Sequence, residues 1–102
     1  MASIESKDIR KIVVACDAGM GSSVMLATQL RRQLKDQKVE VEHTPVNAIP
    51  ADADVVLCHA GLAGRARATA PDTVLIPFRV FIGDPAVTRL ISAIKSGGTV
   101  GA

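Results

Sequence analysis

The fold of this chain is decided by KIVVACDAGMGSS, residues 11–23. Its first part, residues 11–16, is a short run of β-branched and small apolar residues, which is typical of a strand buried on both faces. Two glycines and two serines follow at once, and an amphipathic segment begins behind them. A buried strand, a glycine-bearing loop and a helix in immediate succession indicate a parallel sheet built from βαβ units.

The rest of the chain continues this alternation of strand and helix. Apolar residues at helical spacing predict a helix over 22–36, with Ser22 or Ser23 as its N-cap. We also predict strands over 38–44, 55–57 and 73–76 (the last stopped by Pro77), a short helix over 61–70, and a final helix that Asp84 caps and Pro85 begins. Right-handed crossovers then give an α/β fold, a four-stranded parallel sheet flanked by helices in an open three-layer sandwich.

Length and composition favour one small domain. The chain has 102 residues, with two Phe and no Tyr or Trp, so its core must consist of Val, Ile, Leu and Ala. We expect a single domain over 9–95 between flexible ends, 1–8 and 96–102. A net charge of +2 does not favour nucleic acid, and no apolar run is long enough to cross a bilayer. The sequence therefore predicts a cytoplasmic protein that binds no nucleic acid and does not insert into the membrane.

The two cysteines do not form a metal or disulfide motif. Cys16 and Cys58 lie far apart in the sequence, and no CxxC pair suggests zinc, so we expect neither a metal nor a cofactor. Cys16 stands at the carboxyl end of the first buried strand, and parallel sheets bind their ligands beyond that end. Cys16 is therefore the candidate working thiol, and the alternative is a small packing residue at the end of a strand.

The loop behind Cys16 has the features of an anion site. Its glycines keep side chains out of the approach path, and the backbone N–H groups of the turn and of the first helical turn can point at an anion. The same dipoles should favour the thiolate, provided that Asp17 turns its carboxylate away. We predict Cys16 as the nucleophile and the following residues as the phosphate-binding loop: Asp17, Ala18, Gly19, Met20, Gly21, Ser22 and Ser23.

Three known phosphate-binding loops can be compared with this one. No lysine follows Gly21, as a Walker loop requires, and Val24 stands where a dinucleotide fingerprint needs glycine. The predicted fold and loop are closer to the low-molecular-weight tyrosine phosphatases, but Ser22 occupies the position of their arginine. Without that guanidinium the loop can hold a phosphocysteine, whereas rapid hydrolysis is not favoured.

The loop CDAGMGSS (16–23) after a buried KIVVA strand resembles the phosphorylation loop of the mannitol-type IIB component of the bacterial phosphoenolpyruvate-dependent sugar phosphotransferase system. The resemblance extends through VVLCHAGLAGRAR (55–67) and FIGDP (81–85). It implies that Cys16 accepts a phosphoryl group from a phosphohistidine of a IIA phosphocarrier protein. Cys16 would pass this group to a sugar alcohol, with mannitol as the leading candidate, bound by a membrane IIC permease. No metal or nucleotide is then required.

Two other functions stay open at this point. A small phosphatase or arsenate reductase would use Cys16 as nucleophile and Asp84 as acid, although Asp84 is better placed as a helix cap. A regulatory module would present its phosphorylation state to a transcription regulator.

Arg65 and Arg67 either face the rim of the site or lie on a solvated helix face.

Three further side chains have alternative roles. We place His59 near Cys16 at the possible rim of the site, where it either orients phosphate or simply ends a strand. Cys58 either packs in the core or forms a disulfide with Cys16 under oxidation. His43 lies on the predicted edge strand, and we expect it on the surface.

Overall fold

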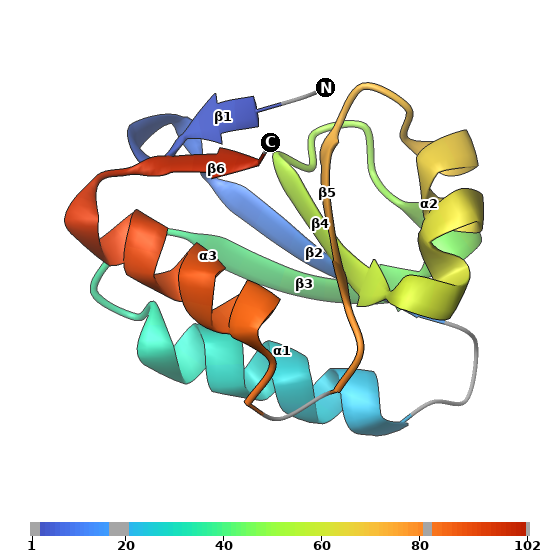
Figure 1. Ribbon diagram of the computed structural model, residues 1–102, viewed down its shortest axis with the longest axis horizontal. Helices are drawn as coiled ribbons and strands as arrows, with labels where there is room; N and C mark the ends of the chain where they lie inside the picture. Colours follow the sequence, from blue (N-terminus) through green and yellow to red (C-terminus); the bar gives the residue numbers. More distant parts are fainter. Residues whose placement is uncertain (1–2, 17–20, 81–82, 102) are drawn as a thin grey trace.

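A computed structural model describes residues 3–16, 21–80 and 83–101. Its central sheet has four parallel strands in the order β3-β2-β4-β5 (Figure 1). These strands are β2 (Lys11–Cys16), β3 (Glu40–Pro45), β4 (Val55–His59) and β5 (Val74–Phe78). The predicted four-stranded parallel sheet is confirmed.

Helices cover both faces of the sheet. Helices α1 (Gly21–Gln33) and α3 (Pro85–Ser96) pack on one face, and α2 (Ala63–Thr69) packs on the other (Figure 1). Two single-turn 3₁₀ helices, η2 (Val46–Ala48) and η3 (Ala60–Leu62), lie before β4 and before α2. The open three-layer α/β arrangement expected from the sequence is therefore confirmed.

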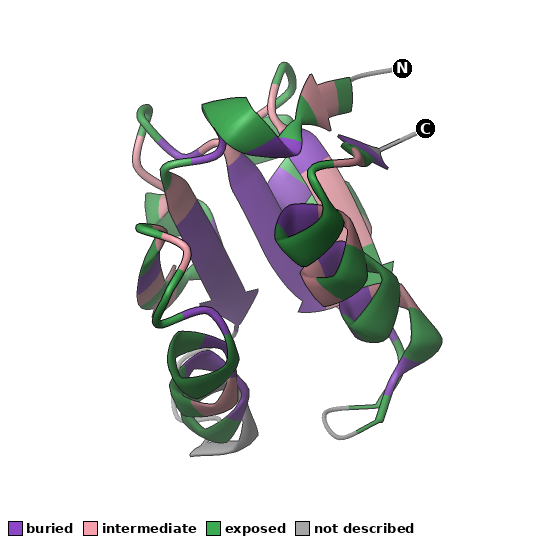
Figure 2. Cartoon of the chain, turned by 90° about the vertical axis from the view of Figure 1, so that its left-hand side faces the viewer, coloured by how far each residue is buried: buried purple, intermediate pink, exposed green. Residues whose placement is uncertain are grey.

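Strand β2 lies at the centre of the core. Successive side chains of a strand point to opposite faces, so Ile12 and Val14 contact α1 and α3, whereas Val13 and Ala15 face α2. All four are at most 1% exposed. Figure 2 shows the buried strands between helices whose outer surfaces are exposed. An apolar run without alternation, as in residues 12–15, is what burial on both faces requires.

Two predictions about how elements begin and end, the N-cap of α1 and the stop at Pro77, are wrong. Helix α1 begins at Gly21, so Ser22 and Ser23 lie within its first turn and neither is the N-cap. Strand β5 continues through Pro77 to Phe78, although we expected Pro77 to stop it. Because β5 is one of the two edge strands of the sheet, a residue without an N–H can lie in it with its nitrogen on the unpaired side.

The two ends of the described chain pair with each other. Strand β1 (Ser3–Glu5) runs antiparallel to β6 (Thr99–Gly101), and the turn η1 (Ser6–Asp8) follows β1. Val100 is buried in the core between α3 and the sheet, and Ile4 packs against it. The sequence analysis assigned these segments to flexible ends and missed the pairing, because strands of three residues are too short to show an alternating pattern.

Candidate functional site

The carboxyl ends of the four parallel strands meet at one edge of the sheet, here called the carboxyl edge. The strands end there at Pro45, Cys16, His59 and Phe78. Cys16 is in register with Pro45, and His59 with Phe78. The residues of the predicted site that the structure describes therefore lie where a parallel sheet binds its ligands.

The Cys16 sulfur contacts an imidazole. Cys16 Sγ lies 2.9 Å from His43 Nε2, within hydrogen-bonding distance. His43 is in register with Val14, two residues before Cys16 on the same face of the sheet. Its side chain is exposed, as predicted, whereas the Cys16 residue is 4% exposed. The imidazole of His43, on the edge strand β3, can therefore accept a proton from the sulfur or donate one to it.

The sequence analysis missed this contact, although one signal for it was present. Val41 is buried, and His43 stands two residues later in the same strand. Strand alternation therefore directs the two side chains to the same face of the sheet, the face that Cys16 also shares. The missing information was the pairing of β3 directly with β2, which places His43 beside the strand that carries Cys16.

His59 lies on the other side of β2. Ala15 is in register with Cys58, so His59 follows at the level of Cys16 on the neighbouring strand, as predicted. The N–H of Gly61 donates to His59 Nδ1 at 3.1 Å, and the ring meets Phe78 edge to face with centroids 6.1 Å apart. These contacts fix the orientation of the ring at the carboxyl edge, and a role at the rim of the site stays a prediction.

Cys58 belongs to the other face of the sheet. It is 0% exposed and packs in the cluster that contains Val13, Ala15 and Ala66. Burial raises the pKa of its thiol above the ordinary value of 9.0, while the positive charge of Arg67 acts in the opposite direction. Strand alternation turns Cys16 toward the face of Val14, so the two thiols point to opposite sides of the sheet. Both cysteines are free, and their opposite orientations favour the packing role of Cys58 over the disulfide that the sequence left open.

Asp84 is fully engaged as a helix cap. Its carboxylate accepts backbone N–H groups from Arg79 at 2.7 Å, Val80 at 3.1 Å and Ala86 at 2.8 Å, and it caps α3 as predicted. These hydrogen bonds, with that of Arg79 the strongest cause, hold the pKa of Asp84 below its usual 3.8, although burial acts against them. A general acid needs the opposite shift, so this geometry does not favour the phosphatase role of Asp84.

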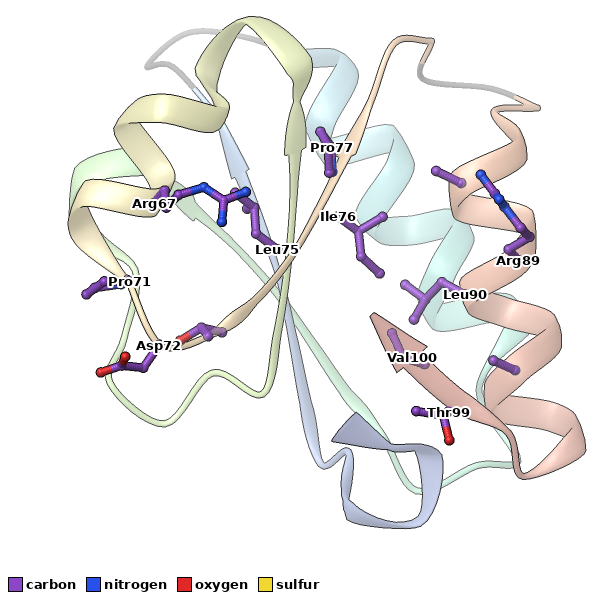
Figure 3. Close-up of a pocket in the computed structure, with 13 residues that line it drawn as sticks. Arg67, Pro71, Asp72, Leu75, Ile76, Pro77, Arg89, Leu90, Thr99 and Val100 are labelled. Carbon is purple, nitrogen blue, oxygen red and sulfur yellow. The ribbon is translucent and has the colours of Figure 1, made fainter. Parts of the chain in front are cut away.

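Arg67 of α2 lines a cavity that does not include Cys16. A cavity of about 950 Å³ lies along the exposed edge of β5, between α2 and α3 (Figure 3). Arg67 lines it from α2 and Arg89 from α3, and neither Cys16 nor His43 is among its lining residues. Arg65 is exposed on α2. For Arg67, the structure supports the solvated helix face rather than the rim of the thiol site.

Part of the predicted phosphate loop lies outside the described residues, namely Asp17, Ala18, Gly19 and Met20. Gly21, Ser22 and Ser23 form the first turn of α1, where backbone N–H groups have no partner within the helix. Within residues 3–16, 21–80 and 83–101, no cluster of three or more His, Cys, Asp or Glu side chains is arranged to hold a metal ion. Across those same ranges, none of the helices is both long and apolar enough to span a membrane.

Comparison with known proteins points to one family. Residues 11–93 match the protein family described as "PTS system, Lactose/Cellobiose specific IIB subunit". The chain is 36% identical over 96 residues to the mannitol-specific EIICB component of Bacillus subtilis, covering 92% of this chain and 20% of that protein. It is 41% identical over 90 residues to the mannitol-specific cryptic EIICB component of Escherichia coli K12, covering 86% and 19%.

A third relative is an EIICBA component, of which this chain covers a smaller share. The mannitol-specific EIICBA component of Vibrio cholerae is 36% identical over 93 residues, which are 89% of this chain and 14% of that protein. The chain thus spans about a fifth or less of the length of these relatives. Among solved structures, a flavodoxin-like domain from Synechococcus aligns with a TM-score of 0.46 and 17% identity, over 85% of this chain and 74% of the other.

Proposed function

Because this chain belongs to the IIB subunit family of the bacterial sugar phosphotransferase system, we propose that it carries a phosphoryl group on the thiol of Cys16. The thiolate attacks phosphorus, the S–P bond forms, and the chain acts as one station of a relay. The position of Cys16 supports this proposal. Its thiol lies at the carboxyl edge, 2.9 Å from an imidazole nitrogen, at the end of the strand that precedes α1 in the chain.

The donor in this proposal is a phosphohistidine of a IIA phosphocarrier protein, and the acceptor is a sugar alcohol bound by a membrane IIC permease. The relatives are named mannitol-specific EIICB and EIICBA components, which supports IIC and IIA as partners and mannitol as the cargo. Transfer from an N–P bond to an S–P bond and onward to a hydroxyl needs no nucleotide. The relay takes place on the cytoplasmic side of the membrane.

Residues 17–23 form the phosphate-binding loop in this proposal. Once the S–P bond has formed, three phosphoryl oxygens need donors, and the unpaired N–H groups at the start of α1 supply some of them together with the positive end of the helix dipole. Ser22 stands where an arginine would stabilise the transition state of hydrolysis. The loop therefore holds the phosphoryl group for transfer rather than releasing it to water.

Phosphorylation with purified components tests this function. The chain is incubated with phosphoenolpyruvate, the general components of the system and a mannitol-type IIA, and intact mass and peptide mapping locate the adduct. One phosphoryl group on Cys16 is expected, together with none in Cys16→Ser and full labelling in the matched variant Cys58→Ala. A folded wild-type chain that gains no mass, or gains it at another residue, would overturn the proposal.

A further inference from the structure

The contact between Cys16 and His43 joins two strands through their side chains. The residues are 27 positions apart in the sequence, and the 2.9 Å distance joins the sulfur to the ε nitrogen of the ring. Pro45 is the register partner of Cys16, so His43 approaches the sulfur diagonally along the inner face of β3. The imidazole is therefore in place beside the reacting atom before any partner binds.

Two charged side chains near His43, Glu42 and Arg31, make contacts with other groups. Glu42 precedes His43, and strand alternation turns it to the other face, where its carboxylate lies 3.5 Å from Lys11 Nζ. Arg31 reaches β3 from α1 with its Nε–H donated to the carbonyl oxygen of Val41. The part of β3 next to Cys16 thus presents its proton-transfer group, His43, directly to the sulfur.

We propose that His43 is a catalytic residue that accepts the Cys16 thiol proton and returns it to the leaving imidazole of the phosphoryl donor. This inference rests on the proposed function. The proton moves from Sγ to His43 Nε2, the thiolate attacks phosphorus, the S–P bond forms and the donor's N–P bond breaks. The proton of the His43 imidazolium then passes to the released donor nitrogen, so the step begins and ends with neutral imidazoles and consumes no other reactant.

The first test measures the thiol without any partner. Wild type, His43→Gln and His43→Asn are treated with limiting iodoacetamide at pH 7, and the alkylation rate of Cys16 is followed by peptide mass. Both variants should react roughly tenfold more slowly, because only the thiolate is nucleophilic and its proton acceptor has been removed. The matched control Glu42→Gln changes the adjacent side chain on the opposite face, and its rate should stay within about twofold of wild type.

The second test measures transfer. Phosphorylation of Cys16 by the IIA donor should slow by roughly 100-fold in the His43 variants, the low end of the usual effect of an acid–base group. Wild-type rates in both assays for folded His43 variants would overturn this inference while leaving the proposed function intact. If wild type is not phosphorylated but the His43 variants are alkylated slowly, the proposed function is overturned. In that case only the role of His43 as acceptor of the Cys16 proton would stand.

A third measurement covers the case in which neither His43 variant folds. Ring ¹⁵N shifts of His43 are compared between wild type and Cys16→Ala. If the two residues share a proton, removal of the thiol should move the Nε2 signal. Unchanged ring shifts would overturn the inference.

Discussion

Cys16 and Cys58 lie near the carboxyl ends of neighbouring parallel strands, and the groups that surround their sulfur atoms are chemically different. Cys58 is 0% exposed in an apolar cluster, where burial raises the pKa of its thiol. Cys16 faces the opposite side of the sheet, touches an imidazole at 2.9 Å and ends the strand that precedes α1 in the chain. A shift of one residue along a strand thus separates a packing thiol from the proposed nucleophile.

The contrast is not one of exposure alone. Cys16 itself is only 4% exposed, so accessibility in the resting structure would rank the two thiols nearly alike. The difference comes from chemical neighbours: a ring nitrogen for one sulfur, and the side chains of Val13, Ala15 and Ala66 for the other. Burial without a polar partner keeps a thiol protonated and unreactive, whereas an adjacent imidazole gives its proton a destination.

Replacement of each cysteine should give the largest difference. Cys16→Ser should lower phosphoryl acceptance from IIA by more than about 1000-fold, because a hydroxyl is a far weaker nucleophile at neutral pH. Cys58→Ala should stay within about twofold of wild type. Initial rates of phosphoprotein formation measure both. Comparable losses in the two variants would mean that the sheet as a whole, and not one thiol, carries the activity.

Replacement of Asp84 tests whether this carboxylate is a helix cap or the acid partner that a phosphatase would pair with Cys16. We expect Asp84→Ala to lower the free energy of unfolding by about 2 kcal/mol, because it removes the cap of α3 and leaves backbone N–H groups without acceptors. Urea denaturation measures this loss. A chromogenic aryl phosphate should show no Cys16-dependent turnover in wild type, and clear turnover that Asp84→Asn abolishes would support a phosphatase instead.

The same carboxylate should give the protein an acid-sensitive contribution to stability. The pKa of Asp84 is lower in the folded state than its usual 3.8, so its stabilisation is present above that value and is lost as the pH falls through the folded pKa. Denaturation curves at a series of acidic pH values should therefore fall less steeply for Asp84→Asn than for wild type. Parallel curves for the two proteins would contradict this expectation.

Selective alkylation sharpens the contrast in the folded protein. Cys16 should react with iodoacetamide at pH 7 at least roughly tenfold faster than Cys58, because the raised pKa of the Cys58 thiol keeps it protonated and its apolar neighbours offer no acceptor for the proton. Peptide mapping after short exposure measures the ratio. In concentrated denaturant the two rates should become similar, and equal labelling in the folded state would remove the distinction.

The smallest expected effect is the stability that Cys58 contributes through packing. Cys58→Ala should cost about 1 kcal/mol of unfolding free energy, because it leaves a small cavity on the α2 face. Below the ordinary thiol pKa of 9.0 this difference should be constant. Above it, the unfolded chain loses the proton more readily than the folded one, so the advantage of wild type over Cys58→Ala should shrink as pH rises. A difference that grows at alkaline pH would contradict the burial of this thiol.

Local patterns predicted most of the fold. The unbroken apolar run of 12–15 indicated a strand buried on both faces, and Asp84 before Pro85 indicated the start of α3, because both signals are complete within a few residues. The course of β5 through Pro77 could not be predicted in this way. Tolerance of that proline depends on β5 being an edge strand, which is a property of the whole sheet.

The sequence by itself singled out Cys16 as the candidate nucleophile, since a cysteine between a buried strand and a glycine-bearing segment marks the carboxyl edge of any parallel sheet. Only the tertiary structure decided its neighbours. It placed His43 against Cys16 and turned Cys58 away, because strand order and register join residues that no local pattern connects. The alternation of side chains between the two faces follows from the sequence of each strand alone. Which strands become neighbours depends on the packing of the whole core.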